Sequence, residues 1–279
     1  MKCVVGYEAT PQGIDAINLG IDIARAMNID LEIVLVLRRH DIFSHEYPPT
    51  GTVDDVLLNQ AFRWLHGALD QIPEDIKARA HVYSGTSTAE GLSRAAKDMA
   101  AEMIVVGGAS SSPFKRHRLG TIAQDLLFGA TVPIALSPRG YLSTPINRIN
   151  CAVGTRPGAG SLVETGIVLS KRAQLPLRLV ALMSEEEGVD AQQRAIDNAH
   201  AVVARVIKDE PAPEFDIEVS ASNLSSVAWN PGDLMFVGSS RVAEKQTVFA
   251  GSVAMRLLKT LSIPLVVVPR EYHMRQVVT

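Results

Sequence analysis

The sequence predicts an α/β protein made of two doubly wound domains, each with a five-stranded parallel sheet. Short apolar runs with little in–out alternation predict strands buried on both faces, and segments with helical periodicity separate them. A glycine-bearing phrase occurs twice: Gly107 and Gly238 lie 131 positions apart, as do Gly120 and Gly251. A chain of 279 residues has room for two such domains, each with its own core.

The first half is expected to alternate five strands with four helices. The strands are expected at residues 3–6, 31–37, 80–83, 103–106 and 134–136, and the helices at 11–27, 53–69, 88–101 and from 121 onward. Thr10 fits an N-cap, with Pro11 at the first helical position. The segments from Ser87 to Glu90 and from Thr121 to Gln124 fit capping boxes. This alternation predicts a doubly wound domain.

The second half repeats the first with an offset that changes along the chain. Pro11 corresponds to Pro157 at an offset of 146, whereas the glycine loops correspond at 131, so the second copy is 15 residues shorter in its middle. Part of this loss is expected before the fourth strand, because residues 223–231 have room for only a turn or two. We therefore predict domains at 1–141 and 147–279, with breaker residues in the linker between them.

Composition and charge narrow the class of protein. The net charge of −3 and the pI of about 6.2 give no electrostatic case for binding nucleic acid or an anionic membrane. No run reaches the roughly 18–20 apolar residues of a membrane span, and the first residues enter a strand without a visible signal peptide. Cys3 and Cys151 suit buried thiols better than a disulfide framework. The expected location is therefore cytoplasmic.

The glycine loop after the fourth strand is the strongest candidate for a binding site. Gly107 lets the chain leave the strand sharply, and Gly120 with Thr121 opens the next helix, whose free N–H groups favour phosphate. The basic run at residues 115–118 adds charge that can neutralise phosphate oxygens. The alternative is structural, because glycines at a strand–helix turn serve chain geometry without any ligand, and a basic run is often a solvated loop.

Two features of the first half occur together, the glycine loop and an acidic residue, Glu8, after the first strand. With them the chain resembles a tandem universal stress protein over nearly its whole length. That family has a Gly-x2-Gly-x9-Gly-Ser/Thr motif, which Gly107 and Gly120-Thr121 fit, whereas Ser110 replaces the middle glycine. The resemblance implies the strand order 3-2-1-4-5 in each domain. It also implies that the two domains pair through strand five as a pseudo-dimer within one chain.

The resemblance further implies an adenine-nucleotide site in the first domain, for ATP with Mg²⁺ or a related nucleotide. Its residues would be Glu8, Val36, Val106, Gly107, Ser110, Gly120, Thr121 and Ile122. A weaker second site would use Gly238, Arg241, Gly251 and Ser252. There Arg241 replaces the middle glycine and Gly154 stands at the acidic position, so Arg241 either fills the phosphate space, the favoured outcome, or contacts phosphate.

Catalytic and metal-binding patterns are weak. The seven histidines show no metal-ligand spacing, and the serines at 110–112 have no evident base beside them. We therefore expect a non-catalytic stress-response protein that acts as an adenine-nucleotide sensor or an interaction module, with at most very slow ATP turnover. One alternative is a nucleotide-free pseudo-dimer for structure or protein interaction; the least favoured is an adenylyl transferase or ATP pyrophosphatase. An unidentified protein partner and a homodimer remain open.

Overall fold

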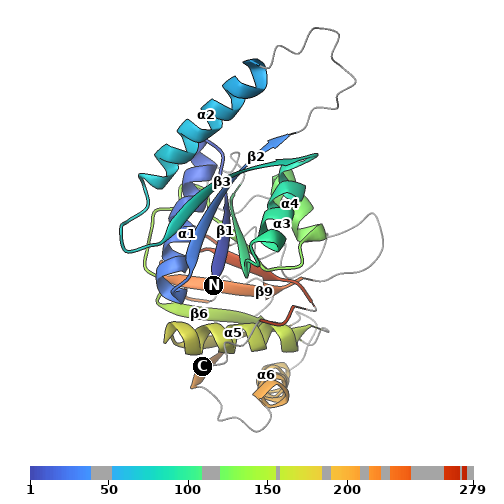
Figure 1. Ribbon diagram of the computed structural model, residues 1–279. Helices are drawn as coiled ribbons and strands as arrows, with labels where there is room; N and C mark the ends of the chain where they lie inside the picture. The colour runs from blue at the N-terminus through green and yellow to red at the C-terminus, as the bar shows by residue number, and fades with distance from the viewer. Residues whose placement is uncertain are drawn as a thin grey trace. The chain divides into compact units, whose positions relative to one another are not determined.

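Figure 1 shows the computed structural model of the chain. The structure describes residues 1–38, 52–108, 120–154, 158–183, 190–207, 214–220, 227–239, 261–270 and 272–274. The described residues fall into two compact units that divide between Ser143 and Thr144. Among them, no helix is long and apolar enough to cross a membrane.

The first unit contains a parallel sheet of five strands. These are β1 (Lys2–Gly6), β2 (Asp30–Arg38), β3 (Ala78–Gly85), β4 (Met103–Gly107) and β5 (Ile134–Ser137), in the order β3-β2-β1-β4-β5. The helices between them are α1 (Pro11–Met27), α2 (Thr52–Leu69), α3 (Thr88–Asp98) and α4 (Thr121–Gly129). Figure 1 shows α1 and α2 on one side of this sheet and α3 and α4 on the other. The predicted alternation and strand order are confirmed.

The second unit repeats this order. Its elements are β6 (Arg148–Val153), α5 (Ala159–Ala173), β7 (Leu177–Leu182), α6 (Ala191–Ile207), β8 (Phe215–Ser220), β9 (Asp233–Gly238) and β10 (Leu265–Val268). Its strands are parallel and lie in the order β8-β7-β6-β9-β10, which is the same 3-2-1-4-5 pattern. The predicted fold class is therefore confirmed, whereas pairing of the two domains stays a prediction.

Local sequence accounts for the helix ends, with one correction. The Thr10 hydroxyl accepts the N–H of Gly13 at 3.3 Å, and α1 ends at Asn28 in the left-handed conformation, as a capped helix should. The Ser87 hydroxyl likewise accepts the N–H of Glu90 at 3.1 Å. The capping box predicted at Thr121 is wrong: the N-cap is Gly120, and no side chain caps the helix. Thr121 is the first helical residue, and its hydroxyl does not cap the helix.

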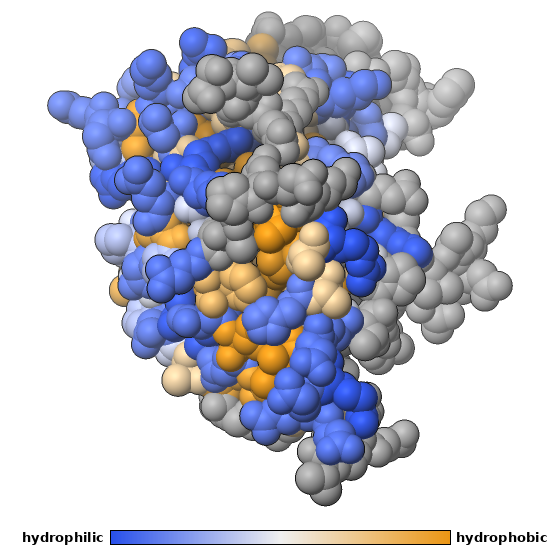
Figure 2. Space-filling view, turned by 90° about the horizontal axis from the view of Figure 1, so that it is seen from below, coloured by the Kyte–Doolittle hydropathy of each residue, from blue (hydrophilic) through white to orange (hydrophobic). Residues whose placement is uncertain are grey.

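The core of each unit is apolar, but a buried charged side chain lies on its second strand. In the first unit it is Glu32, which contacts Nζ of Lys2 at 2.9 Å and Nε2 of His81 at 2.6 Å. At the repeat offset of 146 the second unit has Arg178, which contacts Glu218 at 2.5 Å and Asp233 at 3.5 Å. The two units therefore carry opposite charges at the same strand position, and each charge is paired with side chains of the opposite sign. In the view of Figure 2, hydrophilic residues lie beside a patch of apolar surface, a common mixture for a folded protein.

The pH dependence of stability should reveal the Glu32 cluster. Burial acts to raise the pKa of Glu32, but hydrogen bonds and charge from Lys2 and His81 outweigh it and hold that pKa below its usual value. An acid whose pKa is lowered by folding stabilises the fold above its unfolded pKa, about 4.3, and this contribution is lost as pH falls through the lower folded pKa. We expect Glu32→Gln to lower the free energy of unfolding by about 1–3 kcal/mol at pH 7.

Denaturant titrations of both proteins at a series of pH values from neutral to strongly acidic test this expectation. The difference between wild type and Glu32→Gln should shrink at the acidic end, because the wild-type carboxylate also becomes neutral there. A difference that stays constant with pH would contradict the assignment.

Candidate functional site

A cavity of about 290 Å³ opens at the carboxyl ends of β1 and β4 in the first unit. Chain order reverses between these neighbouring strands, since β2 lies beside β1 on one side and β5 beside β4 on the other. Such a switch point is where open α/β sheets bind ligands. The described residues that line the cavity are Gly6, Tyr7, Glu8, Thr10, Gln12, Gly13, Thr88, Leu92, Val106, Gly107, Gly108, Gly120, Thr121, Ile122 and Ala123.

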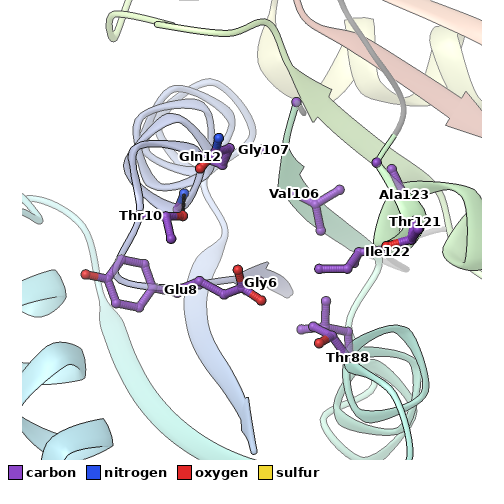
Figure 3. Close-up of a pocket in the computed structure, with 15 residues that line it drawn as sticks. Gly6, Glu8, Thr10, Gln12, Thr88, Val106, Gly107, Thr121, Ile122 and Ala123 are labelled. Atoms are coloured by element: carbon purple, nitrogen blue, oxygen red, sulfur yellow. Dashed lines mark hydrogen bonds between the residues drawn. The ribbon is translucent and has the colours of Figure 1, made fainter. Parts of the chain in front are cut away.

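Six of the eight residues predicted for the first site line this cavity: Glu8, Val106, Gly107, Gly120, Thr121 and Ile122. Figure 3 shows Glu8 on one side of it and Val106 with Ile122 on the other. Val36 does not line it. A Cβ added to Gly91 of α3 would lie 2.5 Å from Cγ1 of Val36, so α3 packs directly on this valine. Ser110 lies outside the described residues.

Sequence reasoning missed the contribution of α3 and of the first turn of α1. Thr88 and Leu92 come from α3, and Thr10, Gln12 and Gly13 from the start of α1. A signal for these residues was available, because helix starts follow the carboxyl ends of the preceding strands and therefore gather at the edge where the glycine loop begins. Both helix starts were recognised from their caps, but not as parts of one site.

The electrostatics of the cavity favour an anion at one end. Helices α1, α3 and α4 all begin at its wall, so three positive helix ends converge on it. At α4 no side chain caps the helix, and the N–H of Gln124 is bonded to the carbonyl of Gly120 at 3.0 Å. The N–H groups of residues 121–123 precede that bond and belong to the helix end that typically binds phosphate.

The side chains that line the cavity also suit an uncharged group with hydroxyls. Glu8 is the one carboxylate among the described lining residues, while Leu92, Val106 and Ile122 supply apolar surface. Tyr7 is 7% exposed and lines the cavity without filling it. Burial raises the pKa of the Tyr7 phenol above its usual value. A ligand with an apolar ring, hydroxyls and a terminal anion would match these walls.

The second unit differs at the corresponding positions. Gly154 stands where the first unit has Glu8, and its carbonyl accepts a hydrogen bond from the Asn198 amide at 3.3 Å. Residues 227–232, which precede β9, contain no helix, and residues 221–226 lie outside the described residues. Gly238 ends β9, whereas Arg241, Gly251 and Ser252 lie outside the described residues. The predicted second site therefore stays a prediction.

Comparison with known proteins identifies the first unit. Residues 1–138 match the model of the universal stress protein family. The first 138 residues form a universal stress protein domain. The predicted resemblance to tandem universal stress proteins is confirmed, because relatives from that family align along their whole length with both halves of this chain. A universal stress protein of Mycobacterium tuberculosis (strain ATCC 25618 / H37Rv) is 24% identical in an alignment of 296 positions that covers 96% of this chain and 100% of the relative.

Solved universal stress proteins share the fold. The crystal structure of one from Archaeoglobus fulgidus superposes with a TM-score of 0.67 at 13% identity, covering 96% of this chain and 98% of the other. That likeness extends the universal stress protein fold through both units. A universal stress protein solved in complex with cAMP covers 50% of this chain at 19% identity and a TM-score of 0.38. Among the described residues, no group of three or more His, Cys, Asp or Glu side chains is placed to hold a metal.

Proposed function

We propose that the universal stress protein domain binds an adenine nucleotide in the cavity between β1 and β4, and that the chain acts as a non-catalytic nucleotide sensor. The observation that carries the proposal is the convergence of three helix N-termini and one carboxylate on a cavity at the switch point of the sheet. The cytoplasm is the proposed location, because its reducing conditions suit the free, buried thiols of Cys3 and Cys151.

Each wall has a proposed role. Glu8 accepts hydrogen bonds from ribose hydroxyls, because an ionised carboxylate is an acceptor only. The N–H groups at the start of α4 bind phosphate oxygens through the positive helix end. Leu92, Val106 and Ile122 pack against the base. The proposal concerns the nucleotide alone, since no group of three or more His, Cys, Asp or Glu side chains among the described residues is placed to hold a metal.

A protein-interaction role is the second candidate, and a feature of α2 favours it. Five large apolar side chains on this helix are exposed by about a third or more, namely Val56, Leu57, Leu58, Phe62 and Trp64. Apolar groups gathered on one exposed helix are typical of surfaces that meet a partner. This role is compatible with nucleotide sensing and would survive its failure.

Calorimetric titration with ATP, ADP and AMP tests nucleotide binding. We expect binding with Kd of about micromolar for at least one nucleotide, and about tenfold weaker binding by Glu8→Gln, because a hydrogen bond to a charged group contributes about 1.5–3 kcal/mol. Glu74→Gln is the matched control, since Glu74 is exposed in the turn before β3, at the other edge of the sheet. No heat up to about millimolar nucleotide would eliminate the sensor and leave the interaction role.

A further inference from the structure

The first turn of α1 lies between the two chain segments that carry the proposed nucleotide site. Thr10, Gln12 and Gly13 all line the cavity. Figure 3 shows Gln12 beside Gly107, with Glu8 on the other side of Thr10. The turn therefore touches both the segment after β1, which carries the carboxylate, and the end of β4, which leads to the glycine loop.

The contact with the Glu8 segment leaves no room for a side chain on Gly13. A Cβ added to Gly13 would overlap the carbonyl oxygen of Glu8 and would lie 2.9 Å from its backbone nitrogen. The same carbonyl accepts the N–H of Thr10 at 2.7 Å, and the Thr10 hydroxyl accepts the N–H of Gly13 at 3.3 Å. The backbone of Glu8 is thus pressed against the capped end of α1 and bonded to it.

The contact with β4 is equally close. A Cβ added to Gly107 would overlap the backbone carbonyl of Gln12, and the three atoms nearest to it all belong to the Gln12 backbone. Backbone groups within a helix cannot rotate aside as a long side chain can. One helical turn therefore fixes the distance between the Glu8 backbone and the end of β4 through two contacts that depend on glycine.

We infer that Gly13 is a positioning residue for the nucleotide site. Without a side chain, Gly13 lets α1 seat against Glu8, and this contact sets the Glu8 carboxylate relative to Gly107 and the start of α4. The inference rests on the proposed function for its consequence, which is nucleotide affinity. Gly13 lies outside the glycine motif and has no side chain that could contact the nucleotide, so its effect is on the position of Glu8.

A double-mutant cycle between Gly13→Ala and Glu8→Gln, measured by calorimetry with the nucleotide that binds wild type best, tests the inference. We expect Gly13→Ala to weaken binding by up to about tenfold, no more than Glu8→Gln does, because displacing a binding group loses its contribution. In the Glu8→Gln background the same change should have little further effect, since the group that it displaces no longer contributes. Gly67→Ala is the matched control, because a Cβ at this helical glycine meets nothing within 4 Å.

The outcomes separate the inference from the function beneath it. Failure of wild type to bind any nucleotide removes the proposed function. Binding that Glu8→Gln weakens and Gly13→Ala leaves unchanged overturns the inference alone, and so does an equal loss from Gly13→Ala in both backgrounds.

Amide hydrogen exchange, measured without nucleotide, tests the proposed role of Gly13 independently of binding. If Gly13→Ala displaces the Glu8 carbonyl, the amide of Thr10 loses its acceptor and its hydrogen exchange should become at least about tenfold faster. Unchanged exchange at Thr10 in a folded variant would overturn the inference. Should Gly13→Ala fail to fold, Thr10→Val loosens the same turn by removing the acceptor of the Gly13 N–H without adding bulk beside Glu8. Its effect on binding should likewise vanish in the Glu8→Gln background, and persistence there would count against the inference.

Discussion

Replacing Asp233 by alanine is expected to destabilise the second unit by about 3–5 kcal/mol, because it takes a buried carboxylate away from the partly buried Arg148 and the buried Arg178. The Asp233 side chain is fully buried, and it accepts hydrogen bonds from Nε and Nη2 of Arg148 at 2.6 and 2.9 Å. Burial acts to raise the pKa of Asp233, but hydrogen bonds from Arg148, Asn230 and Asn150 together with the charge of Arg148 outweigh it and lower that pKa. The buried Arg178 would lose the same carboxylate.

Denaturant unfolding followed by tryptophan fluorescence measures this effect. In a Trp64→Phe background Trp229 is the remaining tryptophan, and it reports on the cluster because the Arg178 guanidinium lies 4.9 Å from its ring centre. Asp197→Ala, which removes an exposed carboxylate from α6, serves as the control and should cost little. A loss below about 1 kcal/mol for Asp233→Ala would show that the cluster contributes little beyond an exposed ion pair.

The second large effect is expected from Gly107→Ala, which should raise the Kd for nucleotide about 100-fold and lower stability by about 1–3 kcal/mol. The new methyl would collide with the Gln12 carbonyl, so either α1 or the end of β4 must move, and both line the cavity. Calorimetry and denaturant unfolding measure the two losses on the same sample.

Gly129→Ala provides the comparison for Gly107→Ala, because a Cβ at Gly129, the last residue of α4, meets nothing within 4 Å. This control should bind nucleotide as wild type does. Unaltered affinity in Gly107→Ala would mean that the ligand does not use the wall between α1 and β4, and the cavity assignment would have to be abandoned.

Much of the fold follows from local sequence signals. Thr10 and Ser87 start helices where their hydroxyls can accept backbone N–H groups, and apolar runs form parallel strands where they were expected. The signal failed at Thr121, because a glycine before it took the cap position. The end of α3 was also missed: the helix was expected to reach about residue 101 and ends at Asp98, and Ala100 has a φ of 52°.

For the candidate site, the sequence supplied the residues of the glycine loop and the acidic residue but not the walls opposite them. The motif identified Gly107, Gly120 and Glu8 because their spacing is written along the chain. It could not identify Leu92, because no local sequence signal indicates that α3 packs beside the end of β1. Val36 is the opposite case: the resemblance placed it in the site, but it does not line the cavity. Its contact with Gly91 depends on how closely α3 packs on β2, which the sequence does not reveal.

The sequence by itself determined that two similar α/β domains follow one another, since periodicity, caps and repeated glycines act over a few residues or recur at a fixed interval. The tertiary structure decided which helix starts share a cavity and how buried charges are neutralised. Glu32 and Arg178 occupy equivalent strand positions with opposite charge, and each fits only because the neighbouring strands bring the complementary groups. Such partners are distant along the chain, and only the register of the sheets and the packing of the helices bring them within contact distance.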